Sequence, residues 1–112
     1  MGKLTLQVQT RYFDAIRSGL KTVEGRIAKP EYLALKPKEL ITFIDPNGES
    51  CTAEICRVTH FTDFREMLEI STVQACIPGA SLNEALEIYR SFPGYKEKEK
   101  EFGVVAIHIK LR

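Results

Sequence analysis

A turn between two apolar segments restricts the fold of this chain more than any other feature of its sequence. Residues 40–44 form a short apolar run, and a second run with β-branched residues extends from about Cys51 to His60. Between them, residues 45–48 read Asp-Pro-Asn-Gly, which favours a tight turn because proline fixes its own φ and glycine accepts a positive one. The sequence therefore predicts an antiparallel hairpin near the middle of the chain.

Both ends of the chain add strands to this hairpin. Leu4, Leu6 and Val8 alternate with polar residues, a pattern that predicts a half-buried strand. Residues 104–111 predict the last strand, with an apolar face at the odd positions and a mixed face at the even positions.

Helical spacing and helix-end signals predict three helices. The first covers Arg11 to Ser18, with Thr10 as its N-cap and Gly19 as the residue that ends it. Asp63 and Ser81 are each followed three residues later by glutamate, which is the spacing of a capping box, and they begin two later helices.

The order of these elements indicates an α+β fold in one domain. A chain of 112 residues with 44% hydrophobic residues can build one core and not two, so a single domain over residues 1–112 is expected. Residues 30–38 hold two prolines and are predicted to form a loop, while the Lys-Glu alternation at 96–101 predicts a solvated helical or mobile segment. No βαβ rhythm occurs, so five or six mainly antiparallel strands with helices at the ends fit the pattern.

Residues 19–26 read Gly-Leu-Lys-Thr-Val-Glu-Gly-Arg and connect the first helix to a strand predicted to extend to about Lys29. Alternate side chains share one face of a strand, so Thr22, Glu24 and Arg26 are expected to project together. Lys21 is expected at the mouth of the same surface, where it would offer a point charge to an anion.

The spacing Gly-x-Lys-x-x-Glu-x-Arg resembles the signature of the ASCH (activating signal cointegrator homology) family, and residues 19–26, called the signature below, match every fixed position. Similar stretches recur at 33–35, 64–68, 89–92 and 102–107, so the resemblance covers nearly the whole chain. It implies a small PUA-like, mostly antiparallel β-barrel of five to six strands with about three flanking helices. It also implies a cleft that binds RNA or a modified nucleoside.

The signature supports two interpretations of its charged residues. Glu24 and Arg26 lie two apart on a strand, close enough to pair, so Glu24 could accept a hydrogen bond from an exocyclic amine while Arg26 donates to a base carbonyl or phosphate. The alternative is a structural ion pair with Lys21 as ordinary surface. A Glu24→Ala variant that loses ligand affinity more than stability would favour the binding site.

An enzymatic alternative follows from the resemblance. Relatives that hydrolyse 4-acetylcytidine carry an active-site lysine, threonine and glutamate, and the lysine matches Lys21 here. The threonine position is Glu24 in this chain, and no acid stands near Ile77 to Gly79, where the glutamate is expected. Thr22 supplies a hydroxyl at a different spacing, so amide hydrolysis is kept as the second hypothesis.

Residues outside the signature carry weaker signals. Tyr89, Arg90 and Phe92 could supply a stacking ring and a phosphate donor to the same cleft, so Arg90 is a further candidate RNA-binding residue. The alternative for Tyr89 is that it continues its helix's apolar stripe. His108 lines the cleft or is hydrogen-bonded structure. The cysteines Cys51 and Cys56 are too far apart on one strand for a disulfide. The spacing of cysteines and histidines suggests no metal site, and no cofactor motif occurs.

Charge is unevenly distributed along the chain, although the net charge is only +1. Residues 1–38 hold eight Lys or Arg and three acids, so a basic surface near the signature is one expectation, and an even distribution in space is the other. The expected partner is RNA or a nucleotide, with a protein-interaction adaptor as a further alternative. With no signal peptide or membrane-spanning segment in its sequence, the chain is expected in the cytoplasm.

Overall fold

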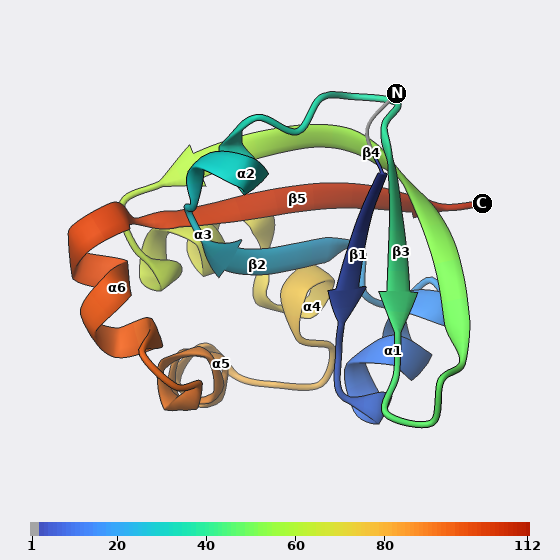
Figure 1. The fold of residues 1–112 in the computed structure, drawn as a ribbon. Coiled ribbons are helices and arrows are strands. Elements are labelled where there is room, and N and C mark those ends of the chain that lie inside the picture. The colour runs from blue at the N-terminus through green and yellow to red at the C-terminus, as the bar shows by residue number, and fades with distance from the viewer. Residues whose placement is uncertain (1–2) are drawn as a thin grey trace.

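Five strands form one curled sheet in the computed structural model, which describes residues 3–112 (Figure 1). The strands are β1 (Lys3–Gln7), β2 (Val23–Ile27), β3 (Leu40–Ile44), β4 (Ser50–Phe61) and β5 (Val104–Leu111). Their order across the sheet is β1-β3-β4-β5-β2. The β1–β3 pair is parallel and the other three pairs are antiparallel, so the α+β, mostly antiparallel expectation is confirmed.

The sheet curls into a half-barrel, consistent with a PUA-like fold, and its two edge strands do not pair with each other. The 12-residue strand β4 curves across the sheet, and its register with β5 shifts between Ile55 and Arg57, where the strand bends (Figure 1). The barrel that the resemblance implied is therefore present as a half-barrel that is open between β1 and β2, because each of these strands has a partner on one side only. The candidate site lies at this opening.

The predicted hairpin is confirmed as β3 and β4. Asp45 accepts hydrogen bonds through Oδ1 from the backbone N–H groups of Asn47 (3.0 Å) and Glu49 (2.9 Å). Gly48 has φ +85°, a value that a residue with a Cβ rarely adopts. Local turn chemistry thus sets this part of the fold.

The described residues contain six helices, more than the three expected. They are α1 (Thr10–Arg17), α2 (Pro30–Leu33), α3 (Phe64–Ser71), α4 (Val73–Cys76), α5 (Leu82–Ser91) and α6 (Tyr95–Phe102). The loop predicted for residues 30–38 begins with the single turn α2, which the first proline allows because that residue needs no N–H partner in a first helical turn. The charged run at 96–101 is part of α6.

The helix ends follow local rules with two exceptions. Gly19 has φ +83° after α1, as expected for the residue that ends a helix. The N-cap of α1 is Gln9, without a side-chain cap bond, so the assignment of Thr10 as the cap was wrong. The box at Ser81 is complete.

At the start of α3 the second exception appears. Asp63 accepts from the N–H of Glu66, as a capping residue does. The carboxylate of Glu66 accepts instead from the N–H of Thr62 at 2.8 Å. The reciprocal bond is therefore displaced by one residue, and the N–H of Phe64 is satisfied by the distant Glu99 (2.8 Å).

Two hydrophobic clusters lie on the two faces of the sheet, and β5 contributes to both. Val104 and Ala106 pack in the cluster with α3, α4 and α5, whereas Val105 and Ile107 pack in the cluster with α1 and β3. This alternation confirms the two faces predicted for the last strand. The helices α5 and α1 therefore belong to different clusters and cover opposite faces of the sheet.

Candidate functional site

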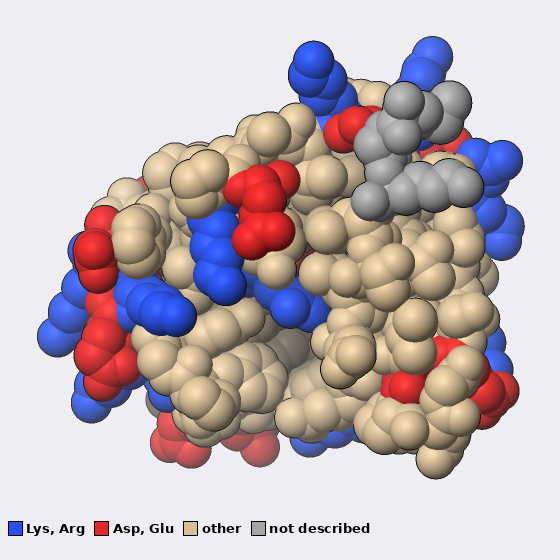
Figure 2. All heavy atoms as spheres, viewed as in Figure 1, with Lys and Arg blue, Asp and Glu red and all other residues tan. Residues whose placement is uncertain are grey.

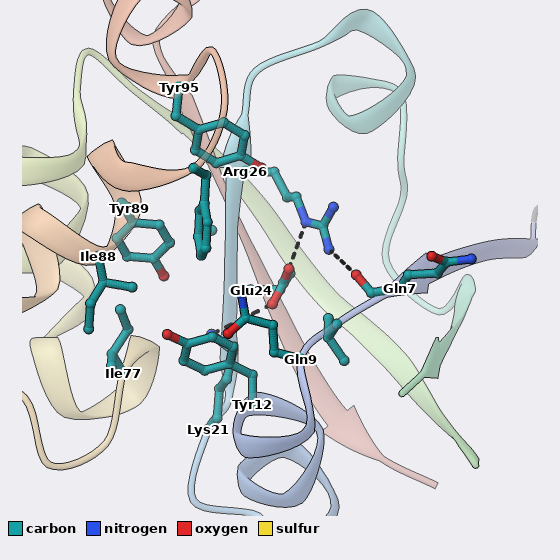
Figure 3. Close-up of a pocket in the computed structure, with 13 residues that line it drawn as sticks. Gln7, Gln9, Tyr12, Lys21, Glu24, Arg26, Ile77, Ile88, Tyr89 and Tyr95 are labelled. Carbon is teal, nitrogen blue, oxygen red and sulfur yellow. Dashed lines mark hydrogen bonds and ion pairs between the residues drawn. The ribbon is translucent and has the colours of Figure 1, made fainter. Parts of the chain in front are cut away.

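A cavity of about 220 Å³ lies where the free edges of β1 and β2 face each other. Its walls come from the end of β1, from α1, from β2 and from the helical segments that follow β4 (Figure 3). The lining residues are Gln7, Val8, Gln9, Tyr12, Lys21, Glu24, Gly25, Arg26, Ile77, Ile88, Tyr89, Phe92 and Tyr95. Segments from both halves of the sequence therefore build one site.

Lys21 lies inside the protein and not at the mouth of the cavity. Its side chain is 4% exposed, and Nζ donates to the backbone carbonyl oxygens of Val23 (2.7 Å) and Cys76 (2.5 Å). Nζ also lies 3.6 Å from Oε1 of Glu24. The expectation of a freely exposed point charge was wrong, because the carbonyl of the distant Cys76 draws the ammonium inward.

Burial near Lys21 also affects the thiol of Cys76. Burial raises the pKa of this thiol to about 11, although the positive charge of Lys21 acts in the opposite direction. Cys76 is therefore a neutral thiol beneath the cavity at physiological pH. A neutral buried thiol is not a nucleophile.

Glu24 and Arg26 pair across one face of β2, as the alternation of the strand predicted. Arg26 Nε donates to Oε2 of Glu24 at 2.7 Å, and the Glu24 side chain is 8% exposed. Burial alone would lower the pKa of Arg26, but the neighbouring Glu24 carboxylate raises it overall. Arg26 Nη2 also donates to the backbone oxygen of Gln7 at 3.3 Å and so connects β2 to the end of β1 (Figure 3).

The glycine between these two residues, at a variable position of the signature, is required by space. A Cβ at Gly25 would lie 2.7 Å from Cε of Met67 and 2.9 Å from the hydroxyl oxygen of Tyr89. Both distances are shorter than real Cβ contacts. Gly25 therefore allows Met67 and Tyr89 to approach the backbone of β2, and its role is packing and not backbone conformation.

Aromatic rings form the wall opposite β2. Tyr89 stacks on Phe64 with ring centroids 4.4 Å apart, and Phe92 meets both Tyr89 and Tyr95 edge to face. Tyr12 completes the aromatic lining from α1 (Figure 3). Tyr89 thus belongs to the apolar stripe of α5 and also lines the cavity.

Sequence reasoning named Tyr89 and Phe92 as possible stacking rings of the cleft, and Phe92 does line the cavity, but it did not single out Tyr12 or Tyr95 as part of the site. A signal was present, because Tyr89 and Phe92 are three residues apart and therefore share one face of α5. The proline-glycine turn after them brings Tyr95 to the same side. A helix with two aromatic residues at this spacing is also typical of an ordinary core, so the signal alone was ambiguous.

Thr22 is exposed and does not line the cavity. It precedes the first residue of β2, so the strand alternation that orients Glu24 and Arg26 does not extend to it. Its N–H donates to the carbonyl oxygen of Ala75, and its own carbonyl accepts from Ile109. Thr22 contributes to the structure through its backbone.

Arg90 lies in a different depression, so its expected place in the same cleft was wrong. It donates to both carboxylate oxygens of Glu99, through Nε at 3.0 Å and through Nη2 at 3.1 Å. The hydrogen bond to Glu99 raises the pKa of Arg90. One helix position separates Arg90 from Tyr89, and successive residues point about 100° apart around a helix.

Two further residues have places in the structure that bear on function. Ile77, in the region where the resemblance implies a glutamate, places an apolar side chain in the cavity wall. His108 pairs with Val23 and with Arg57 in the sheet and is outside the cavity lining, and burial lowers its pKa. Within residues 3–112, no three His, Cys, Asp or Glu side chains gather as a possible metal site.

Figure 2 shows a hollow on this face of the molecule, with Lys and Arg side chains along its upper side and acidic side chains among them. The two signature cations are partly removed from this surface, because Lys21 is buried and Arg26 is paired. This face is therefore mixed and not uniformly basic. Among the described residues, no helix has the length and apolar character needed to cross a membrane.

Comparison with known proteins finds a matching family model and similar solved structures. Residues 6–112 match the family model of the ASCH domain. The structure of hypothetical protein PH0355 is similar, with 31% identity, TM-score 0.87 and coverage of 99% of this chain and 100% of that one. Protein PF0455 from Pyrococcus furiosus also has 31% identity, with TM-score 0.78 and coverage of 98% and 97%.

A more distant likeness concerns the fold alone. The S128A mutant of ZmASCH from Zymomonas mobilis has 16% identity and TM-score 0.63, and the match covers 95% of this chain and 66% of that protein. No curated protein matches the chain.

Proposed function

The chain belongs to the ASCH domain family, and from that premise we propose that it binds one base of RNA, or a modified nucleoside, in the cavity beside β2. The family has a PUA-type fold and is associated with nucleic acids in general. The proposal names the site and the kind of ligand within that general association.

The size of the cavity supports a single flat ring as the ligand. Pockets for drug-sized ligands typically measure roughly 300–1,000 Å³. At about 220 Å³ this cavity is smaller and accommodates one ring system, not a stretch of chain. The aromatic side chains on its wall offer stacking surfaces, which contribute to base binding irrespective of sequence.

The observation that carries the proposal is the fixed position of the Glu24 carboxylate. Arg26 holds one of its oxygens at 2.7 Å, and Lys21 lies 3.6 Å from the other. An ionised carboxylate offers about four acceptor positions, so two cations leave capacity for an N–H or O–H of a ligand. Arg26 is 19% exposed and lies nearer the solvent, where it can meet a ribose or phosphate oxygen.

An amide NMR titration with a short single-stranded RNA carrying one 4-acetylcytidine tests this proposal. We expect shift changes at residues 19–26 and 89–95, and at least tenfold weaker binding by Glu24→Gln, which corresponds to about 1.4 kcal/mol. Glu31→Gln is the matched control, because it removes the same charge from an exposed residue of α2. A folded Glu24→Gln variant that binds as tightly as the wild type would contradict the proposal.

The same titration separates the two alternatives. Free acetate that accumulates with the wild type and not with Lys21→Ala would make the protein an amidohydrolase. In that case Lys21 would act from its buried position, where Nζ donates to the carbonyl oxygens of Val23 and Cys76 and lies 3.6 Å from Glu24. No shift changes with any RNA would favour an adaptor that binds protein.

A further inference from the structure

The hydroxyl of Tyr89 is buried in the cavity wall without a hydrogen-bond partner among residues 3–112. The residue is 3% exposed. Its ring is held by stacking on Phe64, with an interplanar angle of 8°, and its hydroxyl lies against the backbone of Gly25. The hydroxyl therefore cannot turn to a distant partner without breaking this packing.

A buried hydroxyl without a partner costs free energy, so each such group in a folded protein requires an explanation. Phenylalanine would keep the same ring contacts without this cost. Ser71 Oγ is the other partnerless buried oxygen in the described part of the chain, and it is outside the cavity lining. Only the Tyr89 hydroxyl therefore adjoins a space that a ligand can occupy.

The surroundings determine what this hydroxyl can bind. Burial raises the pKa of Tyr89 well above 10, and Cys76 and Glu24 act in the same direction. At neutral pH the group is therefore a protonated phenol that can donate one hydrogen bond. Figure 3 shows the hydroxyls of Tyr89 and Tyr12 turned toward the same space as the Glu24 carboxylate. The nearby cations Lys21 and Arg26 already pair with Glu24, so a second anion placed there would have to compete with this carboxylate for them.

We propose that the Tyr89 hydroxyl donates to an uncharged acceptor, a carbonyl oxygen or ring nitrogen, on the buried edge of the ligand. The neighbouring N–H or O–H of that edge donates to Glu24. The ligand therefore enters with its base first, and its phosphate remains outside near Arg26. This inference rests on the proposed function and specifies the ligand's polar edge and its orientation.

Isothermal titration of Tyr89→Phe with cytidine, uridine, 4-acetylcytidine and inorganic phosphate tests the inference. For each nucleoside that binds the wild type, we expect binding to weaken about three- to tenfold, the usual loss for one neutral hydrogen bond. Phosphate alone should neither bind in the cavity nor displace the nucleoside. Urea unfolding of the free variant should show stability equal to or higher than that of the wild type.

Tyr32→Phe is the control, because it removes the hydroxyl from another buried tyrosine outside the cavity lining. Its nucleoside affinity should equal that of the wild type. Unchanged affinity in Tyr89→Phe would overturn the inference and leave the proposed function intact. A marked loss of stability would also overturn it, since the hydroxyl would then have an internal partner. Failure of every nucleoside to bind the wild type would instead refute the proposed function, and the inference with it.

Discussion

Two glutamates in this protein are buried to a similar extent and each pairs with an arginine, but we expect them to have different roles. Glu24 and Glu99 are 6% and 5% exposed, and each pairs with an arginine through a hydrogen bond of 3.0 Å or less. Glu24 belongs to the family signature, whereas Glu99 lies in a run of alternating lysine and glutamate. Burial and ion pairing alone therefore do not distinguish them.

The difference lies in what surrounds each carboxylate. Both oxygens of Glu99 accept from Arg90, and one also accepts from the N–H of Phe64 at the start of α3, so this carboxylate joins three helices. Glu24 instead faces a cavity with aromatic walls and the unpartnered hydroxyl of Tyr89. We therefore expect a binding role for Glu24, whose neighbours leave a cavity and an unsatisfied hydroxyl, and a structural role for Glu99.

The largest expected effect is the loss of stability in Glu99→Ala. The substitution removes two charge-assisted bonds to Arg90 and leaves the N–H of Phe64 without its acceptor. We expect the free energy of unfolding to fall by about 3 kcal/mol in urea denaturation. Glu101→Ala, an exposed position on α6, should change it by less than about 0.5 kcal/mol. Weaker nucleoside binding by a folded Glu99→Ala variant would contradict the structural assignment.

The next effect concerns alkaline pH and the thiol beneath the cavity. The folded pKa of Cys76, about 11, lies above the ordinary value of 9.0, so the unfolded chain releases this proton first. The Cys76 thiol therefore contributes about 2 kcal/mol to the free energy of unfolding below pH 9, and this contribution is lost as the pH rises toward 11.

Urea unfolding at a series of pH values measures this loss, and Cys76→Ala should reduce the slope between pH 9 and 11, while the raised pKa of Tyr89 accounts for part of the slope that remains. Cys56→Ala removes an exposed thiol and should retain the wild-type slope. Glu99→Ala should also retain it, because Glu99 is not among the groups that shift Cys76. An unchanged slope in Cys76→Ala would show that ionisation of the Cys76 thiol does not affect the stability of the protein between pH 9 and 11.

The smallest effect is the cost of a methyl group at Gly25. Its Cβ would displace the end of Met67 and the Tyr89 hydroxyl, so we expect Gly25→Ala to lower the free energy of unfolding by about 1 to 2 kcal/mol. Combining it with Tyr89→Phe removes one of the two clashes and should recover part of the loss in urea unfolding. Full additivity of the two substitutions would mean that the hydroxyl does not crowd this glycine.

Several features that depend on interactions between near neighbours in the chain were predicted correctly from the sequence. The 45–48 turn, the end of α1 at Gly19, the Ser81 capping box and the Glu24–Arg26 pair each depend on groups within four positions of one another. The missed helix α2 and the misplaced N-cap of α1 are local as well. There the alternatives differ little in energy, so the sequence preference was weak.

The sequence by itself determined the hairpin, the two faces of β5 and the charged pair on β2, because strand alternation and turn chemistry act between near neighbours. Only the tertiary structure decided the burial of Lys21, whose carbonyl partner in Cys76 is 55 residues away. It also decided the role of Glu99, whose bond to Phe64 spans 35 residues. Such groups are buried because distant backbone donors and acceptors need partners, and that need exists only once the chain has folded.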